Sequence, residues 1–133
     1  NIILANNAAL AGHVSVGNNV TIGGLSGVHQ FVRIGEGAFI GALSMVAKDV
    51  IPFGMVYGER AKLMGLNLIG LRRSGRNNKQ IKELRSVYDS IFFDQKKPFN
   101  KKMSNINDIN NPLIKKLVNF LNADKDRAIL SPK

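Results

Sequence analysis

The 133-residue chain contains neither cysteine nor tryptophan. Without cysteine it can form no disulfide, no thiolate nucleophile and no cysteine-ligated metal site. No apolar run approaches the roughly 20 residues of a membrane-spanning helix, and no signal peptide is visible. Because the first residue is Asn1 rather than Met, we expect the chain to be an internal portion of a longer protein.

Acidic residues are few relative to basic ones, and the imbalance is confined to one half of the chain. The net charge is +10. Residues 1–57 carry two basic and two acidic side chains, whereas residues 58–133 carry 17 Lys and Arg against 7 Asp and Glu. The 44% of hydrophobic residues is typical of a globular protein. We therefore expect two structural regimes, of which the second faces an acidic partner.

A six-residue period runs through the first half from Leu4. Its eight blocks are LANNAA, LAGHVS, VGNNVT, IGGLSG, VHQFVR, IGEGAF, IGALSM and VAKDVI. The first position is aliphatic in every block, the second is small in seven, and the fifth is Ala, Val or Ser. Period six fits neither a helix nor an alternating strand and is typical of a hexapeptide β-helix. We expect the aliphatic residue to point inward and the small one to lie where the backbone turns, because Gly turns without steric penalty.

Each coil of such a solenoid buries its apolar face only against neighbouring coils. The end before Asn1 is therefore expected to be open and exposed, which also favours coils missing upstream.

Both histidines of the chain lie inside the repeat. His13 follows Gly12 in AGHVSVG, and His29 occupies a position that the other blocks give to Gly or Ala, followed by Gln30. One interpretation is a surface histidine at a solenoid corner. The other is a polar site between solenoids, with imidazole as donor, acceptor or base. The 16-residue spacing of the two histidines fits no common metal motif, so we predict no metal site.

The second half is predicted to be mainly helical. The segment 49–57 is broken by Pro52 and Gly54 and indicates an exit from the solenoid, followed by a charged loop over 58–62. The apolar run 63–73 predicts a helix that Ser74 and Gly75 end. Residues 96–111, rich in Lys and Asn, predict a loop.

Two apolar stripes at helical spacing follow good capping residues. Asn77 or Asn78 precedes the first stripe, and Asn111 with Pro112 precedes the second. The stripes are Ile81, Leu84, Tyr88, Ile91 and Phe92, and then Leu113, Ile114, Leu117, Val118 and Leu121. Both are expected to pack into a core rather than form a binding surface.

Lys and Arg gather at 72–76, 96–97, 101–102 and 115–116. Three classes of partner fit this excess: the phosphate of a small ligand, an acidic protein or a nucleic acid. Aromatic residues are not interleaved with the basic runs, and no helix-turn-helix, zinc or RNA-recognition motif is present. Nucleic acid is therefore the least favoured partner.

Three segments together resemble one family: LANNAALAGHVSVG, IGGLSGVHQF and GLNLIGLRRSG. The chain resembles the acyl-(acyl-carrier-protein)–UDP-N-acetylglucosamine O-acyltransferases of lipid A biosynthesis over nearly its whole length, less clearly after about Lys96. The resemblance implies a β + α fold: a left-handed parallel β-helix, in part, over residues 1–57, and a C-terminal α-helical domain over 58–133. It also implies a homotrimer with active sites between subunits, in the cytoplasm of a Gram-negative bacterium.

The resemblance further implies a reaction and its site residues. A 3-hydroxyacyl chain passes from acyl carrier protein to the 3-hydroxyl of UDP-N-acetylglucosamine without a metal or redox cofactor. The backbone N–H of Gly12 matches the oxyanion donor, and the basic helices match the face that receives acidic acyl carrier protein. His13 matches a residue of the cleft that contacts substrate, and His29 and Gln30 match residues at the sugar-nucleotide end. Asn67 and Arg73 match nucleotide-binding residues, where the guanidinium meets phosphate.

Three departures from the family's pattern matter. The family's catalytic base is a histidine about one coil before AGH, which these residues do not contain, so we expect the 133 residues alone to be inactive. Ile69 and Ser74 stand where the family often has Glu and Arg, which alters the contacts expected with the nucleotide. Gly41-Ala42 stands where many members have Gly-Gly near the end of the acyl slot, and the extra methyl predicts a shorter acyl chain.

Other functions remain open at this point. A related lipid A N-acyltransferase would share the solenoid and the acyl donor but is not expected to carry GLNLIGLRRSG. A non-catalytic trimeric scaffold or binding protein agrees with the missing base. A basic nucleic-acid-binding module would show steep weakening of DNA binding with salt and no response to a UDP-sugar.

Overall fold

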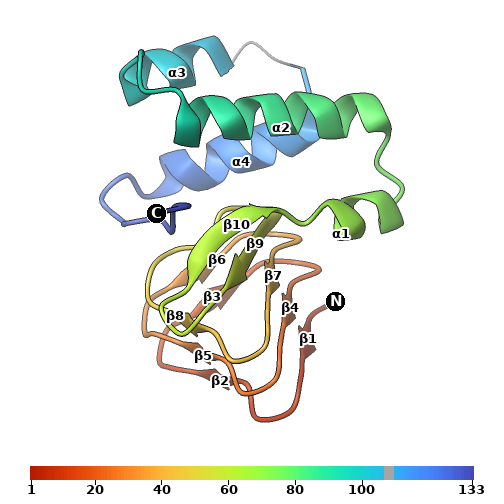
Figure 1. Ribbon diagram of the computed structural model, residues 1–133, viewed down its shortest axis with the longest axis vertical. Helices are drawn as coiled ribbons and strands as arrows, with labels where there is room; N and C mark the ends of the chain where they lie inside the picture. Colours follow the sequence, from red (N-terminus) through yellow and green to blue (C-terminus); the bar gives the residue numbers. More distant parts are fainter. Residues whose placement is uncertain (107–109) are drawn as a thin grey trace.

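The first half of the chain winds into a parallel β-helix (Figure 1) in the computed structural model of the protein, which describes residues 1–106 and 110–133. Its short strands are β1 (Ile3–Leu4), β2 (Ala9–Leu10), β3 (Ser15–Val16), β4 (Thr21–Ile22), β5 (Gly27–Val28), β6 (Arg33–Ile34), β7 (Phe39–Ile40) and β8 (Met45–Val46). Ile3 pairs with Thr21 and Thr21 with Phe39, so one coil takes three hexapeptides. The predicted fold class, a β-helix of hexapeptide repeats followed by helices, is confirmed.

The first and fifth residues of each hexapeptide face inward. Ile22 and Ile40 are fully buried, whereas Leu4 in the first coil is 50% exposed, as expected for an end that no further coil covers in this chain. Ser26 and Ser44 are the polar members of this interior. Their hydroxyls both donate to the Gly41 carbonyl, at 2.9 and 2.7 Å, so the buried hydroxyls keep hydrogen-bond partners.

The small second residue of each hexapeptide is required by the spacing of the coils. A Cβ on Gly17 would lie 2.7 Å from the backbone nitrogen of Glu36 in the next coil. The backbone instead enters the left-handed region two residues later, at Asn7, His13, Asn19, Leu25, Phe31, Gly37 and Leu43. Our expectation that glycine's freedom to turn explains the small position is therefore wrong, because close contact between coils selects the small residue there.

The β-helix ends in a hairpin. Strand β9 (Gly54–Tyr57) pairs parallel with β7 and then antiparallel with β10 (Lys62–Leu66). The predicted helix over 63–73 is wrong in its first part, since only α1 (Leu68–Arg73) is helical. Leu63 and Leu66 are buried and Met64 is exposed, with a bulge between Leu63 and Gly65, so pairing with β9 decides the local structure.

Three longer helices are stacked above β9 and β10 in Figure 1, with α4 the nearest to the hairpin and α3 the farthest, and α1 connects the hairpin to α2. They are α2 (Asn78–Phe93), α3 (Phe99–Ile106) and α4 (Pro112–Ala123). Asn77 caps α2 and Asn111 caps α4, as predicted, and each stripe is buried or half-buried. None of the helices in the described ranges is long and apolar enough to cross a membrane.

Helix α3 falls in the segment that the sequence predicts as a loop. The prediction over 96–111 is wrong for Phe99–Ile106, because Met103 and Ile106 are buried against α2 and α4. Pro98 immediately precedes the helix, and its carbonyl accepts from Lys101 N at 3.0 Å. Residues 107–109 of the predicted loop lie outside the described residues.

Asp49 joins the β-helix to the C-terminal segment. Its side chain is fully buried and accepts from Arg33 Nε at 2.7 Å and from Arg127 Nη2 at 3.0 Å. Its backbone pairs with the C-terminal segment, through Asp49 N to Ala128 O at 3.0 Å and Leu130 N to Asp49 O at 2.8 Å. Burial raises the pKa of Asp49, but the hydrogen bonds from the two arginines outweigh it, so the pKa lies below the ordinary 3.8.

Candidate functional site

One corner of the β-helix carries four of the predicted site residues. Gly12 and His13 follow β2, and His29 and Gln30 follow β5, one coil further along. The pairing of Leu10 with Val28 places the two segments side by side, and all four residues are exposed. The structure thus brings together residues separated by 16–18 positions in the sequence.

Gly12 is a glycine that the fold does not require. A Cβ at this position would have no atom within 4 Å, and its φ lies outside the left-handed region. Among the described residues its N–H makes no hydrogen bond, while its carbonyl accepts from Phe31 N at 3.0 Å. The corner therefore offers a free backbone donor with open space around it, which is the arrangement that stabilises a developing oxyanion.

The His13 imidazole lies flat against the ring of Phe31. The ring centroids are 4.9 Å apart and the planes differ by 5°. Both residues have left-handed backbone conformations, with φ of 60° and 65°. Sequence reasoning missed Phe31, although its position one 18-residue coil after His13 is the signal that could have identified it.

His29 lies at the same corner without an aromatic partner among the described contacts. Its Nδ1 lies 3.2 Å from the Gln30 carbonyl oxygen. In the tautomer that carries its proton on Nδ1, this contact is a hydrogen bond and leaves Nε2 as an acceptor. An exposed imidazole of this kind can accept a hydrogen bond from a hydroxyl or amide N–H, or donate one in the other tautomer.

Asn67 and Arg73 lie elsewhere, at the two ends of helix α1. The Asn67 amide caps the helix, accepting from Gly70 N at 3.1 Å, and donates to the Gly37 carbonyl at 3.1 Å. Arg73 is exposed in the last turn of α1. Asn67 lines a small cavity of about 70 Å³ together with Asn19, Glu36, Gly37, Ser74 and Arg76. Both polar ends of the Asn67 amide already have partners within the chain.

Gly41 and Ala42 follow β7 at a third corner. Gly41 is buried, and the Tyr57 ring occupies the space that a Cβ would take, so the fold itself requires glycine here. Ala42 is exposed beside it. Within one chain the predicted site residues therefore fall into three groups, of which only the group around Gly12 is assembled.

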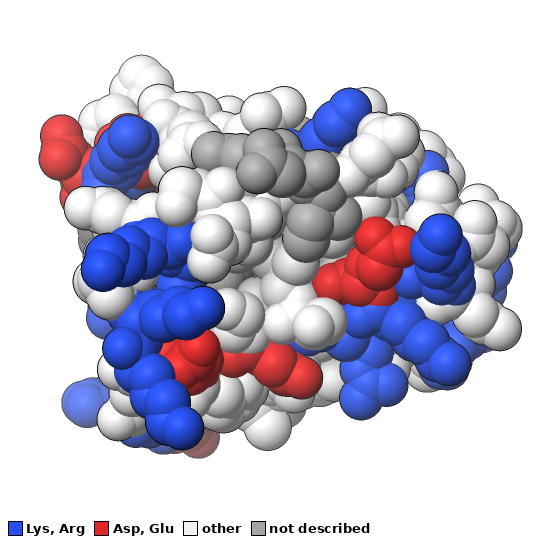
Figure 2. Space-filling model, turned by 90° about the horizontal axis from the view of Figure 1, so that it is seen from above, with Lys and Arg blue, Asp and Glu red and all other residues white. Residues whose placement is uncertain are grey.

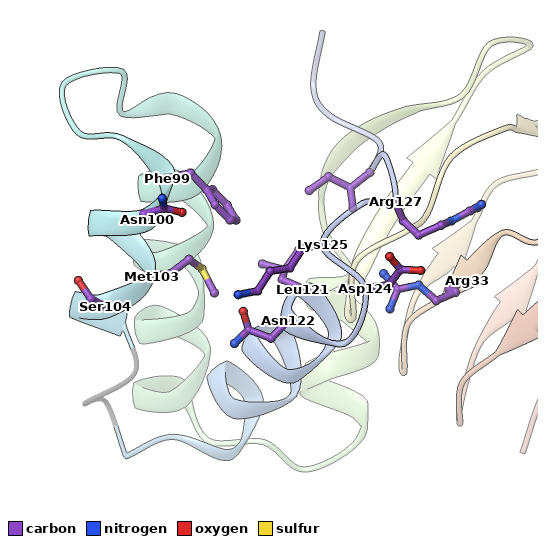
Figure 3. Close-up of a pocket in the computed structure, with 11 residues that line it drawn as sticks. Arg33, Phe99, Asn100, Met103, Ser104, Leu121, Asn122, Asp124, Lys125 and Arg127 are labelled. Carbon is purple, nitrogen blue, oxygen red and sulfur yellow. The ribbon is translucent and has the colours of Figure 1, made fainter.

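A larger cavity of about 650 Å³ lies between α3, the end of α4 and the C-terminal segment (Figure 3). Phe99 and Met103 line it from α3, and Leu121 from α4. Arg33 and Arg127 also line it, but both donate to Asp49. None of the predicted site residues lines this cavity, and two of its charged residues, Arg33 and Arg127, belong to the ion pairs that join the two halves.

The basic side chains of the helices form separate groups on the surface. Figure 2 shows Lys and Arg gathered along two edges of the helical face, with some Asp and Glu between them. Lys79, Lys82 and Arg85 on α2 are exposed, as are Lys101 on α3 and Lys115 on α4. Lys102 differs from these, since it is buried and its ammonium donates to the Asp94 carbonyl. The remaining cations suit an acidic macromolecule.

Comparison with known proteins relates the chain to one family. Residues 49–130 match the family described as UDP N-acetylglucosamine O-acyltransferase, domain 2. A relative from Paracoccus denitrificans, named acyl-[acyl-carrier-protein]–UDP-N-acetylglucosamine O-acyltransferase, is 44% identical over 131 residues, which are 98% of this chain and 49% of the relative. A relative of the same name from Nautilia profundicola is 51% identical over 92 residues, or 69% of this chain and 36% of the relative.

Solved structures agree with the sequence comparison. The UDP-N-acetylglucosamine acyltransferase from Arabidopsis superposes with a TM-score of 0.89 at 37% identity, covering 98% of this chain and 48% of that one. The O-acyltransferase from Moraxella catarrhalis gives a TM-score of 0.88 at 36% identity, covering 97% and 50%. The chain spans about half the length of the curated relatives that match it along its whole length.

Proposed function

The chain belongs to the UDP-N-acetylglucosamine O-acyltransferase family, and from this we propose that it forms part of an acyltransferase of lipid A biosynthesis. The reaction moves a 3-hydroxyacyl chain from acyl carrier protein to the 3-hydroxyl of UDP-N-acetylglucosamine. The observation that carries the proposal is the free N–H of Gly12 in open space beside His13. A thioester carbonyl that approaches this corner gains a backbone donor for the charge that develops on its oxygen.

The proposed roles follow the chemistry of acyl transfer. The sugar hydroxyl attacks the thioester carbon, the C–O bond forms, the C–S bond breaks, and the carrier's thiol leaves. Gly12 N–H stabilises the oxyanion, while His13, His29 and Gln30 bind the substrates beside it. We propose that the general base for the hydroxyl is not one of the two histidines of this chain but the family's histidine outside these residues, so that residues 1–133 alone are inactive.

A complete site needs more than one copy of the chain in this proposal. The groups around Gly12 and Gly41 follow strands of different sheets of the β-helix, and Asn67 lies at the start of α1, so one chain does not assemble them at one corner. In the proposed homotrimer, Arg73 of one copy binds the nucleotide phosphates beside the Gly12 corner of the next. The Asn67 amide is held by Gly70 and Gly37, so we assign Asn67 the positioning of α1 as well as the contact with nucleotide.

Acyl carrier protein and the acyl chain are assigned to two further surfaces. The exposed cations of α2, α3 and α4 (Figure 2) suit an acidic carrier, with the strength of docking falling as salt rises. Ala42 is exposed beside the buried Gly41, and we propose that its methyl shortens the acyl slot. The Ala42→Gly variant is expected to shift the preference toward a longer acyl chain, and an unchanged preference would contradict this role.

A chimera tests the proposed function. Residues 1–133 are joined behind the part of the Paracoccus denitrificans relative that precedes the matched region, and the product is assayed with 3-hydroxyacyl carrier protein. We expect activity on the hydroxyl-bearing UDP-N-acetylglucosamine and none on an amine-bearing UDP-sugar, with residues 1–133 alone inactive. Transfer to the amine would favour the related N-acyltransferase, and a folded but inactive chimera would overturn the proposal.

The Gly12→Ala variant of the chimera tests the oxyanion role. A methyl in the open space keeps a ligand away from the N–H, so kcat is expected to fall by about 10²–10³, as for loss of one oxyanion donor. Asn6→Ala is the matched control, because Asn6 holds the same place in its hexapeptide at another corner and is exposed. Equal activity of Gly12→Ala and the control would remove Gly12 from the mechanism.

A further inference from the structure

Phe31 is an exposed aromatic residue in a costly backbone conformation. Its side chain is 51% exposed and its φ is 65°. A left-handed conformation costs a non-glycine residue of order 1–3 kcal/mol, and Asn7 and Asn19 at equivalent places are residues that tolerate it better. Burial in the core cannot account for a phenyl ring here, so the ring needs another explanation.

Phe31 contacts both predicted reactive groups of the corner. Its ring stacks on His13 at 4.9 Å with planes 5° apart. Its backbone N–H donates to the Gly12 carbonyl at 3.0 Å and so fixes the peptide that joins Gly12 to His13. Because the two rings leave successive coils from the same place and with nearly equal φ, the stack follows from the coil geometry itself.

We propose that Phe31 is a positioning residue for His13: its ring holds the imidazole in one plane over the corner where Gly12 N–H is free. This rests on the proposed function, since it deepens the role of His13 at that site. His29, which has no stacking partner among the described residues, is the natural internal reference. The side chain of Phe31 acts through His13 and touches no reacting atom.

Histidine NMR tests the positioning on the 133-residue chain without any substrate. The chain holds only two histidines, so selective ¹³C,¹⁵N-histidine labelling gives two ring spin systems, assigned with His29→Gln. In Phe31→Leu we expect the His13 ring protons to lose the shielding of the phenyl ring and move downfield, and the His29 signals to stay. Phe31→Tyr keeps a flat ring and is expected to restore the wild-type His13 signals.

Leu43→Ala is the matched control for a general effect of an exposed corner residue. Leu43 is 64% exposed with φ of 61° at another corner, and its removal should leave both histidine signals in place. Unchanged His13 signals in Phe31→Leu, or equal changes in Leu43→Ala, would overturn the positioning role. Equal thermal stability of Phe31→Leu and wild type separates positioning from unfolding.

Titration with UDP-N-acetylglucosamine extends the test to function. We expect Phe31→Leu to weaken binding about two- to tenfold, the range for loss of one aromatic pair, and Phe31→Tyr to bind like wild type. Wild-type affinity in Phe31→Leu would overturn the functional part of the inference. If the wild-type chain does not bind the sugar nucleotide, the result contradicts the proposed binding of substrate by these residues. The histidine spectra still decide whether Phe31 orients His13.

Discussion

The β-helix and the helical region are stabilised in different ways. In the β-helix one set of positions recurs every six residues, and residues 1–57 carry no net charge. In the helical region α2 and α4 each have their own cap and their own apolar stripe, and residues 58–133 hold the whole +10. Repetition spreads stability over many equivalent contacts, whereas the helices and their junction with the solenoid depend on single residues such as Asp49 and Asn111.

The largest effect is expected where the two regions meet. Asp49→Ala leaves Arg33 largely buried without its carboxylate and loosens Arg127, which should lower the free energy of unfolding by about 3–5 kcal/mol. Urea unfolding followed by circular dichroism measures this loss. Asp126→Ala, an exposed carboxylate in the same segment, should change stability by less than about 0.5 kcal/mol. A similar cost for both would show that the junction does not depend on Asp49.

A methyl group is expected to have opposite effects on the stability of the β-helix at Gly35 and at Gly12. A Cβ on Gly35 would lie 2.6 Å from the Cα of Pro52, so Gly35→Ala should cost at least about 1–3 kcal/mol through forced movement of the coils. Gly12→Ala enters open space outside the left-handed region and should be neutral or stabilising by up to about 1 kcal/mol. Thermal unfolding of both variants compares them directly, and equal destabilisation would contradict the distinction between a fold glycine and a site glycine.

We expect loss of the more buried helix cap to lower the free energy of unfolding more. Asn111 is 1% exposed, accepts from Leu113 N at 2.9 Å and donates to the Gln80 carbonyl of α2 at 3.1 Å. Asn77 is exposed, and its side chain accepts from Gln80 N at 2.8 Å without a contact to another helix among the described hydrogen bonds. We expect Asn111→Ala to cost about 2 kcal/mol and Asn77→Ala about 1 kcal/mol in chemical denaturation. The reverse order would show that local capping matters more than the contact between helices.

The smallest effect at neutral pH is the titration of Asp49. Its folded pKa lies below the ordinary 3.8, so its stabilising contribution is complete above that pH and is lost as the pH falls through the folded pKa. We therefore expect unfolding free energy to decline below pH 3.8 more steeply in wild type than in Asp49→Asn. Parallel curves for the two proteins would assign the acid sensitivity to other carboxylates.

The six-residue period made the β-helix predictable from the sequence. Strand β10 and helix α3 could not be predicted, because contacts with distant segments decide their structure. The interior residues and the two capped helices follow from spacing alone. Strand β10 looks helical in sequence because Leu63 and Leu66 also fit a helical spacing, and only β9 makes the segment a strand. Helix α3 is rich in Lys and Asn, and its two buried apolar residues become a core face only through α2 and α4.

The candidate site was predictable to a similar extent. A resemblance supplied Gly12, His13, His29 and Gln30, and the coil register accounts for their proximity. The sequence holds no sign that Gly12 lies in open space, because neighbouring coils decide which glycines a Cβ would disturb. Phe31 was not singled out in the sequence, although its place in the hexapeptide, equivalent to that of His13, puts it on the outside.

A coil of 18 residues gives every position of the corner an equivalent one coil away. Gly12, Gln30 and Lys48 are such equivalents, and the N–H groups of all three make no hydrogen bond among the described residues. Free backbone donors therefore recur once per coil along this corner of the β-helix, separated by the spacing between neighbouring strands, about 4.8 Å. The N–H of Gly12, to which we assign the oxyanion, is the first of three equivalent donors that follow one another along the axis of the β-helix.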